Sequence, residues 1–172
     1  MAWNKTFQKN YSVYAKRYIA AYSSKIDCAD LALATLVDFA GKHNLPIRLK
    51  YYSSGWHWIA HKVTSDNADK VKTAIMRDFG ALNVIDNTKA IPVEDAIAGD
   101  LIMSKWSTTL GHTRIIHSVA PPENAGDDYK ITWYQGTLPP IVPIKKTSSF
   151  KDINGVFGKT PRRWKFDQFN ET

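Results

Sequence analysis

Cys28 is the residue of this sequence best placed to act as a nucleophile. It is the only cysteine in 172 residues, and it lies where a helix is predicted to begin. Asp27 is a favourable N-cap, and Asp30 places a second carboxylate in the first turn. Free backbone N–H groups and the helix dipole lower the pKa of a thiol there, whereas the two carboxylates raise it. A nucleophilic Cys28 therefore needs an activating base, and the alternative is a buried, inert thiol.

The best candidate for that base lies on a predicted hairpin. Residues 112–119 and 129–136 have the composition of two strands, and the loop between them is rich in Pro, Gly and Asp. If they pair as an antiparallel hairpin, His112 lies opposite residue 136. Gln135 then neighbours His112, and its amide can orient the imidazole.

A second histidine on the same strand leaves the choice of base open. His117 is five residues from His112, so on a regular strand the two side chains point to opposite faces. Only one of them can meet Cys28, and the sequence does not decide which. His57 and His61 are four apart and could share a metal on a helix, but their segment is β-branched and aromatic. We therefore expect no metal site.

Two predicted helices should position these residues, and the first is the one that begins at Cys28. Residues 28–39 are rich in Ala and Leu and predict a mostly buried helix, which the segment from Gly41 to Pro46 should end. Residues 7–22 predict another helix, with tyrosines on one face at positions 11, 14, 18 and 22. That face should dock against the core; alternatively, Tyr18 or Tyr22 lends its hydroxyl to the active site.

The segment of about residues 45–90 is predicted to form an insertion. Residues 47–52 predict a strand, residues 53–55 a turn, and residues 56–61 a second aromatic strand. Residues 66–79 predict an amphipathic helix that Gly80 ends. We expect this unit to pack on the main body of a single domain spanning residues 1–172.

Composition excludes several classes of protein. A single cysteine excludes an internal disulfide framework, and no apolar run approaches the length of a membrane span. The first nine residues carry charge without an apolar stretch behind them, so we expect no Sec signal peptide. The net charge of +7 suits a polyanionic partner. Because the basic residues are scattered and no nucleic-acid motif occurs, we expect neither specific nucleic-acid binding nor membrane insertion.

Three segments together resemble the NlpC-type and CHAP cysteine peptidases of the bacterial cell wall. They are residues 27–31 (Asp-Cys-Ala-Asp-Leu), 98–102 (Ala-Gly-Asp-Leu-Ile) and 111–116 (Gly-His-Thr-Arg-Ile-Ile), in that order. The resemblance implies that Cys28 is the nucleophile, His112 the base and Gln135 the third polar residue. The family more often has His, Asn, Asp or Glu in that third place, so His117, Asp127 and Asp128 remain alternatives to Gln135.

The resemblance also implies a fold and a mechanism. The fold would be α+β and papain-like, with an N-terminal nucleophile helix packed on a small antiparallel sheet. A thiolate–imidazolium pair would attack an amide carbonyl without any cofactor, and the Cys28 N–H would stabilise the oxyanion. In addition to this N–H, the candidates for binding the oxyanion or the substrate are Asp27, Tyr22, Trp58 and Trp106.

The function implied is hydrolysis of amide bonds in peptidoglycan stem peptides. Such an enzyme, made in the cytoplasm without a Sec signal and acting on the cell wall, would be a phage lysin or an antibacterial effector injected by a type VI secretion system. An effector would have a cognate immunity protein. Two alternatives remain: a papain-like transferase or deamidase acting on a protein, and a non-catalytic basic binding module.

Overall fold

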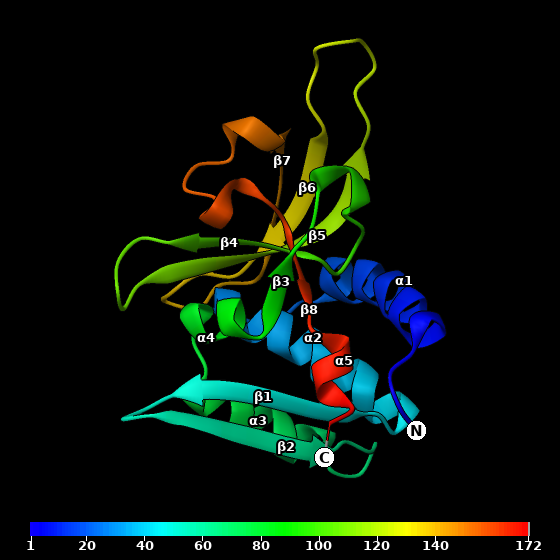
Figure 1. Cartoon of the computed structure of the whole chain (residues 1–172), viewed down its shortest axis with the longest axis vertical. Coiled ribbons are helices and arrows are strands. Elements are labelled where there is room, and N and C mark those ends of the chain that lie inside the picture. Colours follow the sequence, from blue (N-terminus) through cyan, green and yellow to red (C-terminus); the bar gives the residue numbers. More distant parts are fainter. Residues whose placement is uncertain (172) are drawn as a thin grey trace.

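The computed structural model describes residues 1–171 and shows a mixed α+β architecture (Figure 1). The helices are α1 (Lys5–Ala21), α2 (Cys28–His43), α3 (Ala68–Asp78), α4 (Ala81–Asp86) and α5 (Phe166–Phe169). The strands are β1 (Pro46–Tyr52), β2 (Trp56–Lys62), β3 (Thr88–Ala90), β4 (Leu101–Lys105), β5 (Gly111–Ala120), β6 (Lys130–Gln135), β7 (Ile144–Ser149) and β8 (Arg162–Trp164). None of the helices in residues 1–171 is both long and apolar enough to cross a bilayer.

Two antiparallel sheets organise the chain. The larger has six strands in the order β3-β8-β4-β5-β6-β7, and every neighbouring pair in it is antiparallel. The smaller is the β1–β2 hairpin, which lies on the far side of α2 from the larger sheet (Figure 1). The prediction of an α+β fold with a small antiparallel sheet is therefore confirmed.

Helix α2 forms the centre of the fold. It begins at Cys28 as predicted, and the Asp27 carboxylate caps it by accepting the backbone N–H of Asp30 at 2.7 Å. Most of its residues from Ala29 onward are buried, because α1, α3 and β5 all pack against it. A helix that is apolar on all sides needs such enclosure, and the enclosure fixes its N-terminus in space.

The helix ends within the predicted segment of residues 41–46. The helix continues through Gly41 to His43, and Asn44 ends it with a left-handed conformation at φ 53°. A Cβ at Gly41 would lie 2.8 Å from the Ala68 Cβ. Gly41 is therefore a packing residue, which allows the start of α3 to approach α2, and Asn44 is the residue of the segment that ends the helix.

The tyrosine face of α1 docks against the core, as predicted. Tyr11 is buried in the core, and Tyr14 and Tyr18 are partly buried and pack against that core. The Tyr18 hydroxyl donates a hydrogen bond to the Asp38 carboxylate on α2. The chain ends also meet, because the Asn170 side chain bonds the backbone of Trp3 in both directions, at 2.7 and 2.9 Å.

The segment of residues 45–90 contains the predicted strand, strand and helix, and two elements that were not predicted. Helix α4 has six residues and β3 has three, so neither is long enough to show a periodic pattern. β3 pairs with β8 and belongs to the larger sheet. Within the segment, β3 is thus the element that belongs to the sheet of β4 and β5.

The predicted β5–β6 hairpin forms, with a register that differs slightly from the expected one. Ile115 pairs with Tyr134 and Ile116 with Trp133, and a bulge at His117 then shifts the pairing so that Ser118 meets Thr132. Continuing the pairing places Arg114 opposite Gln135 and His112 beyond the end of β6. The three side chains of His112, Arg114 and Gln135 consequently share one face of the sheet.

Candidate active site

An open cleft of about 830 Å³ lies on that face of the larger sheet. Cys28 contributes to it from the start of α2, and His112 and Gln135 contribute from β5 and β6. Trp106, from the turn between β4 and β5, lines its rim. The structure therefore brings together the three residues that the sequence proposed as nucleophile, base and orienting residue, together with one of the predicted substrate-binding tryptophans.

The Cys28 thiol is a neutral group in this environment. Burial raises its pKa above the ordinary thiol value and the charge of Asp27 adds to this, while the backbone N–H groups of Thr113 and Ala29 act in the opposite direction. These N–H groups, from β5 and from the start of α2, thus offset only part of the effect of burial. The thiol needs a base to lose its proton.

His112 is held as a neutral imidazole. The ring is buried, and Trp106 stacks on it with an interplanar angle of 9° and a centroid separation of 5.8 Å. Burial lowers the pKa of His112, and the positive charges of Arg114 and Lys146 lower it further. A neutral imidazole can accept a proton, which is what a general base beside Cys28 must do.

Gln135 is positioned by a residue that sequence reasoning did not assign to it. The indole N–H of Trp133 donates to the Gln135 Oε1 at 2.9 Å, which fixes the orientation of the amide. The interaction of His112 with the Gln135 side chain raises the pKa of the imidazole, as an oxygen accepting from a ring N–H does. Trp133 lies two residues before Gln135 on the same strand, so period-two spacing is the signal that could have found it.

Glycine at position 136 joins the two halves of the site. A Cβ there would lie 2.6 Å from the carbonyl oxygen of Asp27, and it would clash with that of Ile26 as well. Ile26 also forms a bridge with Ile141, where its N–H donates to the Ile141 carbonyl at 2.9 Å. The chain after Gln135 therefore packs directly on the two residues that precede the nucleophile.

Arg114 is the residue of the cleft that the sequence did not single out. It lies two positions after His112 on β5 and is only 8% exposed. Its guanidinium donates to the Ser104 hydroxyl at 2.9 Å and to the Asn154 carbonyl at 3.3 Å. None of the five ion pairs found in residues 1–171 includes Arg114, so its charge has no protein carboxylate as a partner.

Three of the four predicted substrate-binding residues do not line the cleft. Tyr22 follows the end of α1 and packs on the Tyr18 ring, with a centroid separation of 5.7 Å. Trp58 lies on β2, where the Arg48 guanidinium stacks over it at 3.8 Å. Neither lines the cleft. Asp27 acts as the cap of α2 and does not line the cleft either.

The three alternatives to Gln135 also lie outside the cleft. His117 sits at the β5 bulge against the Tyr134 ring. Asp127 and Asp128 belong to the loop between β5 and β6, where Asp128 accepts the backbone N–H of Lys151 at 2.6 Å. Of the four candidates for the third polar residue, Gln135 alone lines the cleft together with His112.

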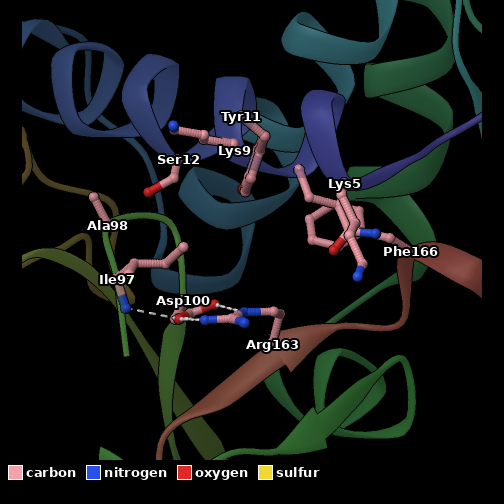
Figure 2. Close-up of a pocket in the computed structure, with 10 residues that line it drawn as sticks. Lys5, Lys9, Tyr11, Ser12, Ile97, Ala98, Asp100, Arg163 and Phe166 are labelled. Atoms are coloured by element: carbon pink, nitrogen blue, oxygen red, sulfur yellow. Dashed lines mark hydrogen bonds and ion pairs between the residues drawn. The ribbon is translucent and has the colours of Figure 1, made fainter. Parts of the chain in front are cut away.

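Asp100, from the Gly-Asp-Leu segment, stabilises the fold at a different place. Its carboxylate accepts two N–H groups of Arg163, at 2.7 and 2.8 Å, and the backbone N–H of Ile97 at 2.9 Å (Figure 2). It lines a pocket of about 210 Å³ beneath α1, next to Tyr11. This part of the resemblance therefore concerns structure and contributes nothing to the cleft.

The described residues contain no group of three or more His, Cys, Asp or Glu side chains placed to hold a metal ion. His57 and His61 lie on the strand β2, and the His57 ring bonds the Ser53 carbonyl at 2.8 Å. Comparison with protein-family models, with curated proteins and with solved structures found no match to this chain.

Proposed function

We propose that this chain is a cysteine hydrolase of papain-like type that cleaves amide bonds in peptidoglycan stem peptides. One observation carries the proposal: Cys28, at the start of a buried helix, lines the same cleft as His112 and Gln135. A nucleophile, a base and a residue that orients the base are the parts that covalent acyl transfer requires.

The electrostatics of the cleft favour general-base catalysis over a resting ion pair. The pKa of Cys28 is raised and that of His112 is lowered, so the thiol and the imidazole are both neutral before substrate binds. The sequence favoured a preformed thiolate–imidazolium pair. In the proposed mechanism the imidazole instead takes the thiol proton as Sγ attacks the carbonyl carbon.

The remaining steps use groups that the fold already holds. The Cys28 N–H belongs to the first turn of α2, where N–H groups lack an intrahelical acceptor, so it can donate to the oxyanion of the tetrahedral intermediate. The imidazolium of His112 then protonates the leaving amine, and a thioester remains on Cys28. His112 next takes a proton from water, which attacks the thioester and releases the acid.

The shape and charge of the cleft suit an extended anionic peptide. Trp106 and Leu138 form exposed apolar rims, with 61% and 81% of their surfaces accessible. Arg114 and Lys146 supply positive charge, and Asp152 is the carboxylate among the lining residues. Stem peptides carry free carboxylates on a wall polymer, and the chain has a net charge of +7.

The test is digestion of purified peptidoglycan with the wild-type protein, followed by mass spectrometry of the soluble fragments. Hydrolysis adds one water at a defined amide bond, so the fragment masses identify the bond. Cys28→Ala is the matched control and should release no fragments. Release of the same fragments by Cys28→Ala would contradict the proposal.

Delivery remains part of the proposal. The enzyme would reach the wall as a lysin or as an injected type VI effector, and an effector would be blocked by an immunity protein that covers the cleft. Expression directed to the periplasm of a Gram-negative host should lyse the cells. Cytoplasmic expression should not, because the substrate is absent there.

The raised pKa of Cys28 favours one other candidate, a non-catalytic binding module with an inert thiol. Alkylation by iodoacetamide separates the two. In an enzyme, His112→Ala should slow the labelling of Cys28 at pH 7.5, because it removes the base that takes the thiol proton. Equal labelling rates for the wild type and His112→Ala would support the binding module.

A further inference from the structure

We propose that Arg114 is a specificity-determining residue, whose guanidinium binds a carboxylate of the substrate beside the reacting amide. The inference rests on the proposed function and adds to it the chemical class that the cleft recognises. The substrate would be an acyl donor with a free carboxylate close to the scissile bond. A peptide that is neutral at that position would be a poor substrate.

The first argument is the unpaired charge. Removing an arginine from water has a large free-energy cost unless an anion or several hydrogen bonds compensate it. Arg114 is 8% exposed, and Ser104 and Asn154 accept only two of its five N–H groups. No carboxylate in residues 1–171 pairs with it.

The second argument is the position of the side chain. Arg114 lines the cleft together with Cys28 and His112. Its charge adds to burial in lowering the pKa of His112, and burial lowers the pKa of Arg114 itself while the nearby Cys28 acts in the opposite direction. A substrate group bound at the guanidinium therefore lies in the same cleft as the nucleophile.

The third argument is that Arg114 is held in place. Ser104, directly opposite His112 on β4, fixes one Nη atom, and the Asn154 carbonyl fixes the other. A guanidinium held in this way keeps its planar fork and loses little side-chain entropy when a carboxylate binds. Such charge-assisted pairs are stronger than hydrogen bonds between neutral groups.

The experiment varies the substrate and the enzyme together. A synthetic stem peptide with free carboxylates is compared with the same peptide in which the carboxylate next to the scissile bond is converted to a carboxamide. The wild type should hydrolyse the carboxylate form with a kcat/KM about 10- to 100-fold higher. In Arg114→Gln this ratio should fall to about one. Arg114→Lys, which keeps the charge and loses the fork, should be intermediate.

Lys145→Gln is the matched control, because Lys145 is an exposed lysine on β7 that does not line the cleft. The wild-type preference should change by less than about threefold in this variant, since exposed charges contribute little. Isothermal titration calorimetry of the two peptides with Cys28→Ala measures their binding and gives the same comparison without catalysis. It should show tighter binding of the carboxylate form.

Each outcome is decisive. If Arg114→Gln lowers the rates on both peptides equally and raises the pH at which Cys28 alkylates, Arg114 serves the thiolate and the proposal is wrong. If the wild type shows no preference, in hydrolysis or in binding to Cys28→Ala, the proposal is wrong even where Arg114→Gln does not fold. If neither peptide is hydrolysed but the carboxylate form binds, the proposed hydrolysis fails and carboxylate recognition stands.

Discussion

Two arginines on the larger sheet differ in what compensates their charge. Arg163 on β8 meets the Asp100 carboxylate through two hydrogen bonds, in a pocket covered by α1 (Figure 2). Arg114 on β5 has a hydroxyl and a carbonyl as partners and no carboxylate. The first charge is neutralised within the fold, whereas the second remains available to a ligand.

The difference separates residues that hold the fold from residues that act on a substrate. A compensated pair such as Asp100–Arg163 should matter mainly to stability, because breaking it leaves a charge without its partner. The cleft residues should matter mainly to the reaction. Substitutions in the two places can test this distinction in order of expected effect.

The largest effect is expected from replacing His112, the proposed general base. His112→Ala should lower kcat/KM for peptidoglycan fragments by about 10³- to 10⁴-fold, because proton transfer then lacks its acceptor. His117→Ala is the matched control, and the activity should change by less than about threefold. The bulge places His117 outside the cleft, against Tyr134. A larger loss in His117→Ala than in His112→Ala would mean that His117 is the base.

The next largest effect is expected in the free energy of unfolding, when the Asp100–Arg163 pair is broken. Asp100→Asn keeps the shape of the side chain and leaves Arg163 without an anion, so the free energy of unfolding should fall by about 3 kcal/mol. Urea denaturation at pH 7 measures the change. At a temperature where the variant is folded, its kcat/KM should lie within about threefold of wild type. A loss of rate without a loss of stability would make Asp100 part of the active site.

The Gln135 series tests the weakest member of the proposed triad. A neutral amide orients His112 but cannot stabilise its positive charge as a carboxylate does. Gln135→Ala should therefore lower the rate by about 10- to 1,000-fold, which corresponds to roughly 1.4–4 kcal/mol on the barrier. Gln135→Asn should be intermediate, and Gln135→Glu should retain or raise activity because a carboxylate favours the imidazolium.

Initial rates of fragment hydrolysis measure this series, and circular dichroism checks that each variant folds. Trp133→Phe removes the indole N–H that fixes the Gln135 amide and keeps an aromatic ring in its place. It should give part of the Gln135→Ala defect. A folded Gln135→Ala enzyme with an unchanged rate would exclude Gln135 from the site.

The sequence predicted the helix that presents Cys28 because its signals are local. The Asp27 cap and the Ala- and Leu-rich run act within one segment, and the β5–β6 hairpin follows from strand composition and a loop. The predicted register differed from the observed one because the loop side of the hairpin is centred at residue 125 instead of 124, as the pairing of Ala120 with Lys130 shows, and the bulge at His117 corrects only part of this offset. No short-range pattern marks that bulge.

The parts that were missed depend on contacts between distant segments. Arg114 became notable only when the structure showed it buried without a carboxylate, which no spacing in the sequence reveals. Tyr22 and Trp58 were selected as aromatic residues near the motifs, but α1 and β2 carry them away from the cleft. Gly136 was not noticed because its close approach is to Ile26 and Asp27, more than 100 positions earlier.

The smallest expected effect concerns Asp30, which lies two residues after the nucleophile in the first turn of α2. Burial, followed by the nearby Asp27 carboxylate, raises the pKa of Asp30 to about 7, and its Oδ1 is buried without a hydrogen-bond partner. The folded protein therefore holds a proton on Asp30 between about pH 4 and 7, where the unfolded chain does not. Because the folded state binds more protons, this group makes the free energy of unfolding fall as the pH rises through that window.

Asp30→Asn removes the titrating group and tests this directly. Relative to wild type, the variant should be similar in stability at pH 4 and more stable at pH 8, by about 1–2 kcal/mol once the partial exposure of the carboxyl is discounted. Urea denaturation at both pH values gives the difference, and the exposed Glu94→Gln serves as the control with no such trend. If the stability difference between Asp30→Asn and wild type were the same at pH 4 and pH 8, Asp30 would be ionised throughout, and the start of α2 would carry two negative charges beside Cys28.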